Sequence, residues 1–387
     1  MMLDISDAVW LPVLIPVFWI IGLRIAVKLQ IPVRLGSALY WWHTLFSLMY
    51  YLISSVKISD ARGYYAAGQH PDWVIAVGSQ FVNFLSGILV SVLGMGCFST
   101  FIVFGFFGYI ALLLLAHLLI VYYPEEYGVE VNWRMVYIVL FLPSLSYWSC
   151  ALGKDALAFL GCCLALFATV DLLRRKWLLF LAIFIMYMVR PQAAMCMLIA
   201  IALAILFSSD VTYTFRVFMS LLMVVAMVFL LPYVIQYIGI ERKGGDVGGY
   251  LAWSQEFGYN GDAGSIVISD MAWPVRLFAY MFRPLFIDAK NVLMLLSSLE
   301  NMLLLFLFVK CSREIVRIVV VGNNFLFRYA MVYSALMWVM LGNTTTNLGG
   351  AFRQKSMFLP ALLALLVFAV ARSSVEQEPS CCPENAN

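Results

Sequence analysis

Charged residues are scarce in this chain. Asp, Glu, Lys and Arg together make up 12% of its 387 residues, whereas roughly a quarter of an average soluble domain is charged. Hydrophobic residues account for 64% of the chain, and its mean hydropathy is +0.94. Because so few charges cannot cover the surface of a soluble protein of this length, the sequence predicts an integral membrane protein.

Motifs for metal and nucleotide binding are also missing. The three histidines are scattered, no HExxH motif or CxxC pair occurs, and the P-loop pattern GxxxxGK[ST] is absent. We therefore expect no required cofactor, although loop aspartates leave a divalent cation open as an alternative. The net charge of +3 comes from dispersed basic residues, so no basic patch indicates a nucleic-acid partner.

Long apolar runs recur along the chain, each continuous and suited to a transmembrane helix across a core about 30 Å thick. Strands of a membrane barrel would alternate in hydropathy instead. The predicted fold class is an all-α polytopic membrane protein with about eleven transmembrane helices. The runs cover 9–23, 36–55, 100–122, 134–151, 155–173, 177–189, 191–207, 217–238, 291–309, 325–342 and 357–372. The first run lacks a basic leader and a cleavage site, so we interpret it as a span.

The basic loops predict the orientation, because Lys and Arg concentrate on the cytoplasmic side of membrane proteins. The basic loops lie on the same side of the membrane only if the stretch 79–97, which Gly and Ser residues interrupt, does not cross the bilayer. We therefore predict an interfacial or re-entrant helix there, on the outer face. This gives one transmembrane domain, 1–372, with outer loops 56–99 and 239–290 and a disordered cytoplasmic tail, 373–387. A single kinked helix around Arg190-Pro191 would change this topology.

Under this topology the polar segments gather on the outer face. Ionisable residues near a bilayer are costly, which makes them candidates for function. The five segments are 59–65, 153–155, 190–192, 239–290 and 347–355.

Asp60 is the leading candidate for acid–base catalysis. It follows the second predicted span and precedes Arg62 and Tyr64. A carboxylate at the bilayer surface beside aromatic rings suits a sugar or lipid head group. An ordinary interfacial loop is the alternative interpretation.

Lys154, Asp155 and Arg190 are further candidates for substrate binding. Lys154 and Asp155 lie in a turn between spans, where they either pair and cap the next helix or hold a phosphate. Arg190 precedes a proline at a helix break, and the N-terminus of the next helix favours an anion there.

Basic residues also occur in the last two outer segments. The loop 239–290 ends in an amphipathic stretch that predicts an interfacial helix. Its arginines, Arg276 and Arg283, are available for lipid phosphates, and its large apolar side chains are expected to face lipid, namely Phe278, Tyr280, Met281 and Phe282. The turn before the last span carries Arg353 and Lys355, on the side where positive charge should be scarce. Binding of a lipid phosphate or diphosphate explains such a turn.

Four of these motifs together resemble those of bacterial polysaccharide-assembly membrane proteins. The group comprises Wzy-type O-antigen polymerases, EpsG-like proteins and glycosyltransferases of the GT-C fold. The resemblance is carried by Asp-x-x-x-Tyr at 60–64, Pro-x-x-x-Tyr-Trp-x-x-x-x-Gly-Lys-Asp at 143–155, Arg-Pro at 190–191 and Arg-x-Lys at 353–355. It implies a GT-C-like fold and transfer of a saccharide from a polyprenyl phosphate or diphosphate carrier to a glycan or lipid acceptor.

The resemblance also implies roles for individual residues. Asp60 would be the general base, and Arg353 with Lys355 would hold the phosphates of the donor. The acidic loop follows the second span rather than the first, and its acidic pair is reduced to Asp60. Both departures favour a polymerase over a protein mannosyltransferase. The implied partners are membrane lipid and chain-length or export proteins, at the outer leaflet of the bacterial inner membrane.

Two other functions are weighed against this one. A transporter or lipid-linked oligosaccharide flippase should show internal repeats and ionisable residues in mid-span, and the sequence shows no clear repeat. A membrane acyltransferase should carry a catalytic histidine, whereas His117 stands alone in an apolar run.

Overall fold

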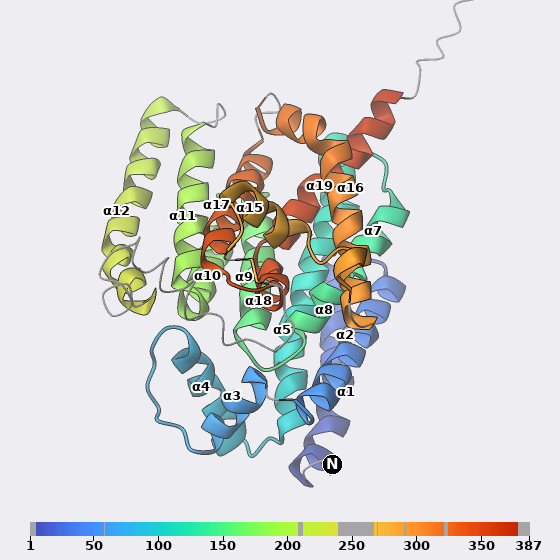
Figure 1. Cartoon of the computed structure of the whole chain (residues 1–387), viewed down its shortest axis with the longest axis vertical. Helices are drawn as coiled ribbons and strands as arrows, with labels where there is room; N and C mark the ends of the chain where they lie inside the picture. The colour runs from blue at the N-terminus through green and yellow to red at the C-terminus, as the bar shows by residue number, and fades with distance from the viewer. Residues whose placement is uncertain are drawn as a thin grey trace, which may run out of the picture.

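The computed structural model describes residues 5–57, 59–207, 212–238, 267–268, 270–289, 292–320 and 324–377 (Figure 1). These residues form helices joined by short connections, and an isolated β-bridge pairs Val267 with Asn347. The α-helices are α1 (Ile5–Lys28), α2 (Val33–Ser54), α3 (Asp60–Gln69), α4 (Ser79–Gly87), α5 (Cys97–His117), α6 (Tyr123–Tyr127), α7 (Trp133–Leu140), α8 (Pro143–Ser149), α9 (Lys154–Thr169), α10 (Lys176–Val189), α11 (Pro191–Leu206), α12 (Tyr213–Ile238), α15 (Trp273–Phe282), α16 (Val292–Val320), α17 (Phe325–Thr344), α18 (Leu348–Gln354) and α19 (Leu359–Gln377). Short π or 3-10 turns are η1 (Ile88–Val92), η2 (Leu118–Tyr122), η3 (Phe286–Asp288) and η4 (Lys355–Met357).

The all-helical class and the membrane-type helices predicted from the sequence are confirmed. Five helical segments are long and apolar enough to cross a bilayer. They are Ile5–Lys28, Cys97–Tyr127, Arg216–Gln236, Met294–Ile318 and Phe325–Thr344, and a sixth forms if the bent pair Leu348–Met357 and Leu359–Arg372, at 69°, counts as one span. Helices α9, α10 and α11 have 16, 14 and 16 residues, or about 21–24 Å at 1.5 Å per residue. Eleven full spans are therefore not established.

The predicted span 134–151 is two short helices rather than one. Helix α7 ends at Leu140, and α8 begins at Pro143. The proline ring disfavours helical backbone at the residue before it, and Leu142 accordingly has φ −57° and ψ 120°. Hydropathy alone cannot reveal this break, because the residues on both sides of it are apolar.

Two further expectations concern helix ends. Arg190, with φ −148° and ψ 76°, separates α10 from α11, so the predicted break before Pro191 is present. Helix α19 continues to Gln377, past the predicted start of the tail at 373, and residues 378–387 lie outside the described ranges.

The stretch 79–97 contains α4 and η1, with nine and five residues. At about 21 Å, this segment is shorter than a hydrocarbon core of about 30 Å. It packs on α3, and both lie beside the N-terminal half of α5 (Figure 1). The Gly78 N–H donates to the Met188 carbonyl at 2.7 Å, which ties the start of α4 to the end of α10.

The end of the long predicted loop, 239–290, is folded onto the bundle. Helix α15 is present, but its Tyr280, Met281 and Phe282 are buried, so the expectation that they face lipid is wrong. They pack against apolar side chains of α16 and α17. The sequence alone does not show that these helices lie next to α15. The first part of the loop, including 241–246, lies outside the described residues.

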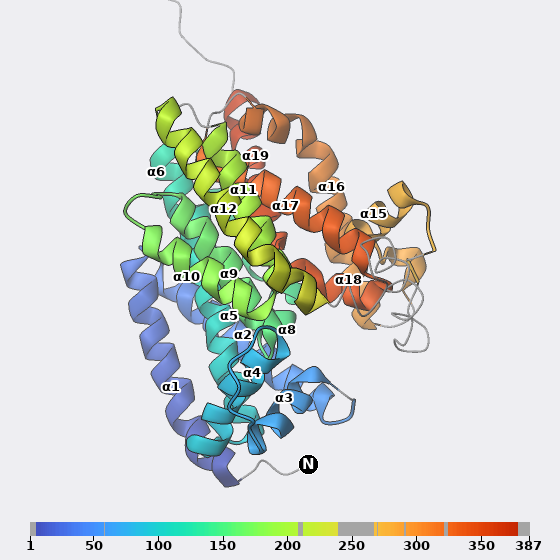
Figure 2. The ribbon, with the colours of Figure 1, turned by 90° about the vertical axis from the view of Figure 1, so that its left-hand side faces the viewer.

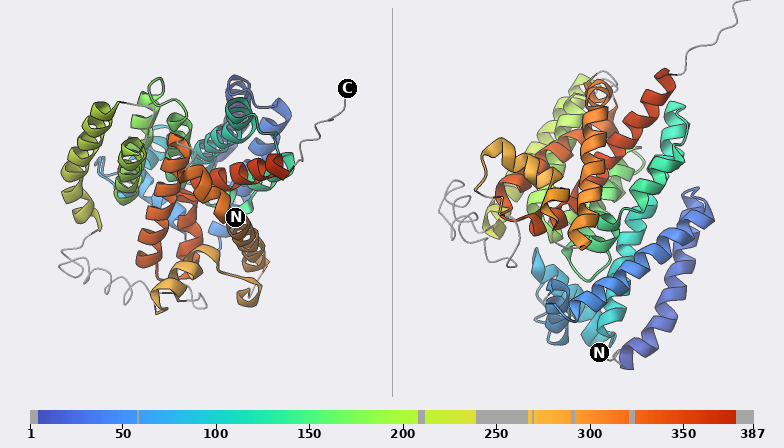
Figure 3. Two further views of the ribbon diagram at one scale, coloured as in Figure 1. Left: turned by 90° about the horizontal axis from the view of Figure 1, so that it is seen from above. Right: turned by 45° about the vertical axis from the view of Figure 1, so that its right-hand side comes forward.

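Several predicted cytoplasmic loops meet at one end of the bundle. A ring nitrogen of His117 lies 2.9 Å from the carbonyl of Leu29, and its ring packs on Phe167. The guanidinium of Arg175 lies over the same Phe167 ring, 3.9 Å from its centre. Arg328 donates a hydrogen bond to the carbonyl of Phe207, directly after α11. The start of α1 and the end of α19 lie at opposite ends of the molecule (Figure 3), and α12 covers the outside of α11 (Figure 2).

Helix α5 is the central element that positions the polar turn after α8. A Cβ added at Gly108 would lie 2.4 Å from the Ser149 carbonyl oxygen, so only glycine permits this approach. The Ser47 hydroxyl donates to the Cys150 carbonyl at 2.9 Å. The turn that leads to Lys154 is thus held against α2 and α5.

Asp7 caps the N-terminus of α5. It is fully buried; its Oδ1 accepts from the backbone N–H and hydroxyl of Ser99, at 2.8 and 2.6 Å, and its Oδ2 from Phe98 N–H at 3.3 Å. A buried carboxylate is tolerated here because it satisfies helix N–H groups that otherwise lack partners.

Replacing Asp7 by Ala should destabilise the protein by about 2 kcal/mol, because the α5 N-terminus loses a charged cap. Chemical denaturation of the purified protein in detergent, followed by circular dichroism, measures the change. Asp72→Ala, at an exposed aspartate, is the matched control and should be nearly neutral. Equal loss in the two variants would contradict this assignment.

Candidate functional site

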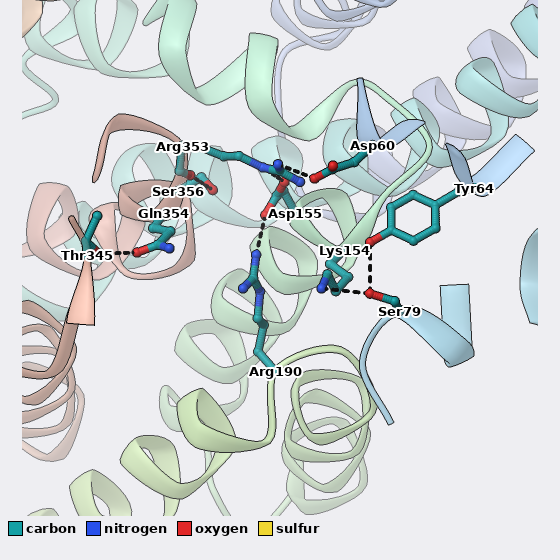
Figure 4. A network of polar contacts seen from close by, with 10 residues as sticks. All are labelled: Asp60, Tyr64, Ser79, Lys154, Asp155, Arg190, Thr345, Arg353, Gln354 and Ser356. Atoms are coloured by element: carbon teal, nitrogen blue, oxygen red, sulfur yellow. Dashed lines mark hydrogen bonds and ion pairs between the residues drawn. The ribbon is translucent and has the colours of Figure 1, made fainter. Parts of the chain in front are cut away.

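Four segments that are distant in the sequence bring charged side chains together (Figure 4). Asp60 is the first residue of α3, and Asp155 lies in the first turn of α9. Arg190 lies at the junction of α10 and α11, and Arg353 lies in the last turn of α18. We call these four residues the charge cluster.

Arg353 joins the two carboxylates of the charge cluster. Its Nε donates to Asp155 Oδ2, and its Nη1 donates to Asp60 Oδ2, both at 2.5 Å. The guanidinium is suited to this role because its donors are fixed in a plane and point in different directions. This contact fastens α18 to both α3 and α9.

Asp155 is buried and uses both carboxylate oxygens. Oδ2 binds Arg353, and Oδ1 accepts from Arg190 Nη2 at 3.3 Å. Its side chain is 6% exposed, and the positive charges of Arg353 and Arg190 on either side stabilise the ionised carboxylate. Asp155 is therefore the ionised anchor between two cations.

Asp60 is the accessible carboxylate of the charge cluster. Its side chain is 56% exposed, against 6% for Asp155. Ser59 caps α3 by accepting from Arg62 N–H at 3.4 Å, so Asp60 occupies the favourable first turn. Its Oδ2 binds Arg353, and the carboxylate remains accessible from outside the protein.

Lys154 lies beside the charge cluster and contacts a residue that the sequence analysis missed. Its Nζ donates to Ser79 Oγ at 3.1 Å, and the Tyr64 hydroxyl lies 3.4 Å from the same oxygen. Burial and the neighbouring Arg190 lower the pKa of Lys154 to about 8. No motif marks Ser79, because only the docking of α4 brings it to this position.

A cavity of about 250 Å³, including its open mouth, adjoins the charge cluster. Asp60, Asp155 and Arg353 line one part of it, and Tyr50 and Trp148 supply aromatic walls. Such a combination of ring faces and charged groups suits a saccharide, because sugars stack on rings and donate hydrogen bonds. Tyr50 lies inside a predicted span, where no neighbouring motif marks it as a site residue.

Three predicted site residues point elsewhere. Arg62 Nε donates to Ser54 Oγ at 3.3 Å, and its guanidinium lies over the ring of Tyr51. Arg283 forms an ion pair with Asp288 and lowers the pKa of that carboxyl. The Nε atom of Arg276 is buried without a partner among the described residues.

Lys355 lies in a different cavity from Arg353. Residues two apart on a helix do not face the same direction. The Lys355 Nζ donates to Asn301 Oδ1 at 2.9 Å, within a cavity that contains none of the charge cluster. Arg353 and Lys355 therefore do not line a common cavity, in contrast to the expectation that they hold the same phosphates together.

The described residues contain no group of three or more His, Cys, Asp and Glu that could hold a metal ion. Within the charge cluster, Arg353 lies between the two carboxylates, where a divalent cation would otherwise bind.

Replacing Asp155 by Asn should destabilise the protein by about 3–5 kcal/mol, because two arginines lose their buried counter-charge. Denaturation in detergent measures the loss. The control is Asp171→Asn, which breaks the exposed pair with Arg174 and should cost less than about 1 kcal/mol. Similar losses for the two variants would show that Asp155 does not anchor the charge cluster.

Lys154 should react with an amine-directed acylating reagent with a midpoint near pH 8, because only the neutral amine is nucleophilic. Peptide mass spectrometry after timed labelling measures its rate from pH 6 to about pH 11. Arg190→Gln removes a neighbouring positive charge, which should raise the pKa of Lys154 and move the midpoint to higher pH. A midpoint that the substitution leaves unchanged would refute the predicted coupling.

Comparison with known proteins gives this site no precedent. No family model, curated protein or solved structure matches the chain.

Proposed function

We propose that the chain is a membrane-embedded glycosyltransferase of the polysaccharide polymerase type, with a GT-C-like fold. It transfers a saccharide from a polyprenyl phosphate or diphosphate carrier to a glycan or lipid acceptor at the outer leaflet of the bacterial inner membrane. The observation that carries the proposal is the exposed carboxylate of Asp60, held by Arg353 at the mouth of a cavity with aromatic walls.

In this reaction Asp60 is the general base. Its carboxylate accepts the proton of an acceptor hydroxyl while that oxygen bonds to the anomeric carbon of the donor sugar. The bond between the anomeric carbon and the carrier's phosphate oxygen breaks, and its electron pair leaves with the phosphate. Protons, charges and bonds therefore balance without a cofactor.

Arg353 links proton uptake to departure of the phosphate. It is bound to two carboxylates at rest, so it is not a free anion-binding group. When Asp60 takes up a proton, its attraction for Arg353 weakens, and the guanidinium becomes available to the leaving phosphate. Asp155 and Arg190 keep Arg353 in place during this change.

The positions of the basic residues support the proposed side of the membrane. The charge cluster lies at one end of α9 and α10, whereas Arg175, between these helices, lies at the other. The positive-inside rule assigns the Arg175 end to the cytoplasm. The charge cluster then faces the outer leaflet, where carrier-linked saccharides are assembled.

A transporter or flippase is the second candidate, because Lys355 and Glu300 line a cavity among the helices. Ionisable groups in such positions are typical of translocation pathways. A flippase would move a carrier-linked saccharide across the bilayer without lengthening it, so product analysis distinguishes the two functions.

Asp60→Asn should reduce saccharide transfer by about 10²- to 10⁴-fold, because amide nitrogen and oxygen cannot replace the base. Gel analysis of surface glycan in cells relying on each variant, together with mass spectrometry of carrier-linked saccharide, provides the measurement. The matched control, Asp72→Asn, should extend glycan normally. Normal polymer from folded Asp60→Asn protein would refute the proposal, and unpolymerised units retained in the inner leaflet would favour the flippase.

A further inference from the structure

A second, larger cavity lies next to that of the charge cluster, and Trp148 lines both. Its volume is about 530 Å³ including its open mouth, and its walls come from α7, α8, α16, α18, η4 and α19. Phe352 and Lys355 line it, whereas Arg353 lines the cavity of the charge cluster. We call it the Lys355 cavity.

Most of the Lys355 cavity is apolar. Leucine side chains of three helices form its walls, so it has the lining expected for a hydrocarbon chain. They are Leu145 of α8, Leu303, Leu304 and Leu307 of α16, and Leu359 and Leu363 of α19.

One polar group of the Lys355 cavity is a buried ammonium. Lys355 is 2% exposed, and its Nζ donates to Asn301 Oδ1 at 2.9 Å and lies 5.5 Å from the centre of the Phe352 ring. Asn301 is itself fixed, because its amide donates to the Pro284 carbonyl at 3.0 Å. Lys355 forms no ion pair with a described residue, and its remaining donors are available to a ligand.

The second polar group is the carboxylate of Glu300, next to Asn301 on α16. Its Oε1 accepts from the backbone N–H of Ser144 at 3.0 Å, at the start of α8. Within the described ranges, Glu300 also has no ion pair. A basic and an acidic side chain thus line the same apolar cavity, close enough to interact electrostatically but without an ion pair.

This arrangement favours a ligand that carries both charges. A charge in an apolar cavity is costly unless an opposite charge meets it. A diphosphate would neutralise Lys355 but repel Glu300, and an uncharged polyol would leave each group with only the other, beyond ion-pair distance, as its counter-charge. A zwitterionic head group supplies a phosphate for Lys355 and an ammonium for Glu300.

We propose that the Lys355 cavity binds a phospholipid with a phosphoethanolamine head group. Its phosphate accepts from Lys355, its primary ammonium donates to Glu300, and an acyl chain lies along the leucines of α16 and α19. The apolar side chains of Leu299, Met302 and Phe306, on the same stretch of α16, are exposed. This site does not depend on the proposed transfer reaction.

The bound lipid would also support the charge cluster. Phe352 and Lys355 contact the lipid cavity, and Arg353 between them binds Asp60 and Asp155. Filling the cavity therefore fixes the segment that carries Arg353.

Lipid competition tests this proposal with the full-length protein in nanodiscs. The discs contain equal amounts of phosphatidylethanolamine and phosphatidylglycerol with identical chains, and native mass spectrometry identifies the lipid retained after release. Wild-type protein should retain about tenfold more phosphatidylethanolamine, since one charge-assisted contact distinguishes the two head groups. Equal retention of both lipids by the wild type would overturn the proposal, whether or not any variant folds.

Two substitutions separate the charges. The Lys355→Met protein should retain about tenfold less phosphatidylethanolamine than the wild type. The Glu300→Gln protein should shift its preference toward phosphatidylglycerol, because it lacks the carboxylate that binds the ammonium group. Lys310→Met, at an exposed lysine of α16, should retain lipid as the wild type does. Asp60→Asn should also retain it, so loss of transfer and loss of lipid are distinguishable. Unchanged preference in folded Lys355→Met and Glu300→Gln proteins would refute the assignment.

Discussion

The contact between Arg353 and two carboxylates is the interaction on which the polar end of this molecule depends. Asp155 lies 198 residues before Arg353, and Asp60 lies 293 residues before it. One guanidinium therefore joins the segment after the second helix, the start of α9 and the helix before α19. Its partners are charged, so the join is stronger than contacts between neutral groups.

The same contact decides what chemistry the site can perform. A lone arginine facing an apolar surface would be an anion receptor, as the basic turn suggested. Arg353 is instead neutralised by Asp60 and Asp155, and Asp155 is further held by Arg190. Under the proposed function this makes Asp60 the group that changes charge and Arg353 the group that responds. In surroundings of low polarity electrostatic interactions are stronger than in water, so a change of charge on Asp60 has a large effect on Arg353.

Two neighbouring cavities, both lined by Trp148, have different roles in the proposed scheme. The charge cluster adjoins a small cavity with aromatic walls, and Lys355 and Glu300 adjoin a larger apolar one. Arg353 and Lys355 are two residues apart, so their side chains point in different directions. The two basic residues of the Arg-x-Lys motif therefore belong to two sites, and a different ligand is proposed for each.

The amino-acid sequence alone predicts the helical class and the membrane-type composition, and it is enough to select Asp60, Lys154, Asp155, Arg190 and Arg353 as candidates. Composition suffices for the first two, because apolar residues in long runs leave the backbone few other ways to satisfy its hydrogen bonds. Costly charges among such runs suffice for the third. The clustering of Asp60, Asp155, Arg190 and Arg353, with Lys154 beside them, follows from the tertiary structure. So do the positions of Ser79, Tyr50 and Trp148 next to these charged groups, and the placement of Lys355 in one cavity with Glu300 and Asn301. Those outcomes depend on how helices pack on α5 and α9, and side-chain directions across such contacts leave no periodic signal in a single sequence.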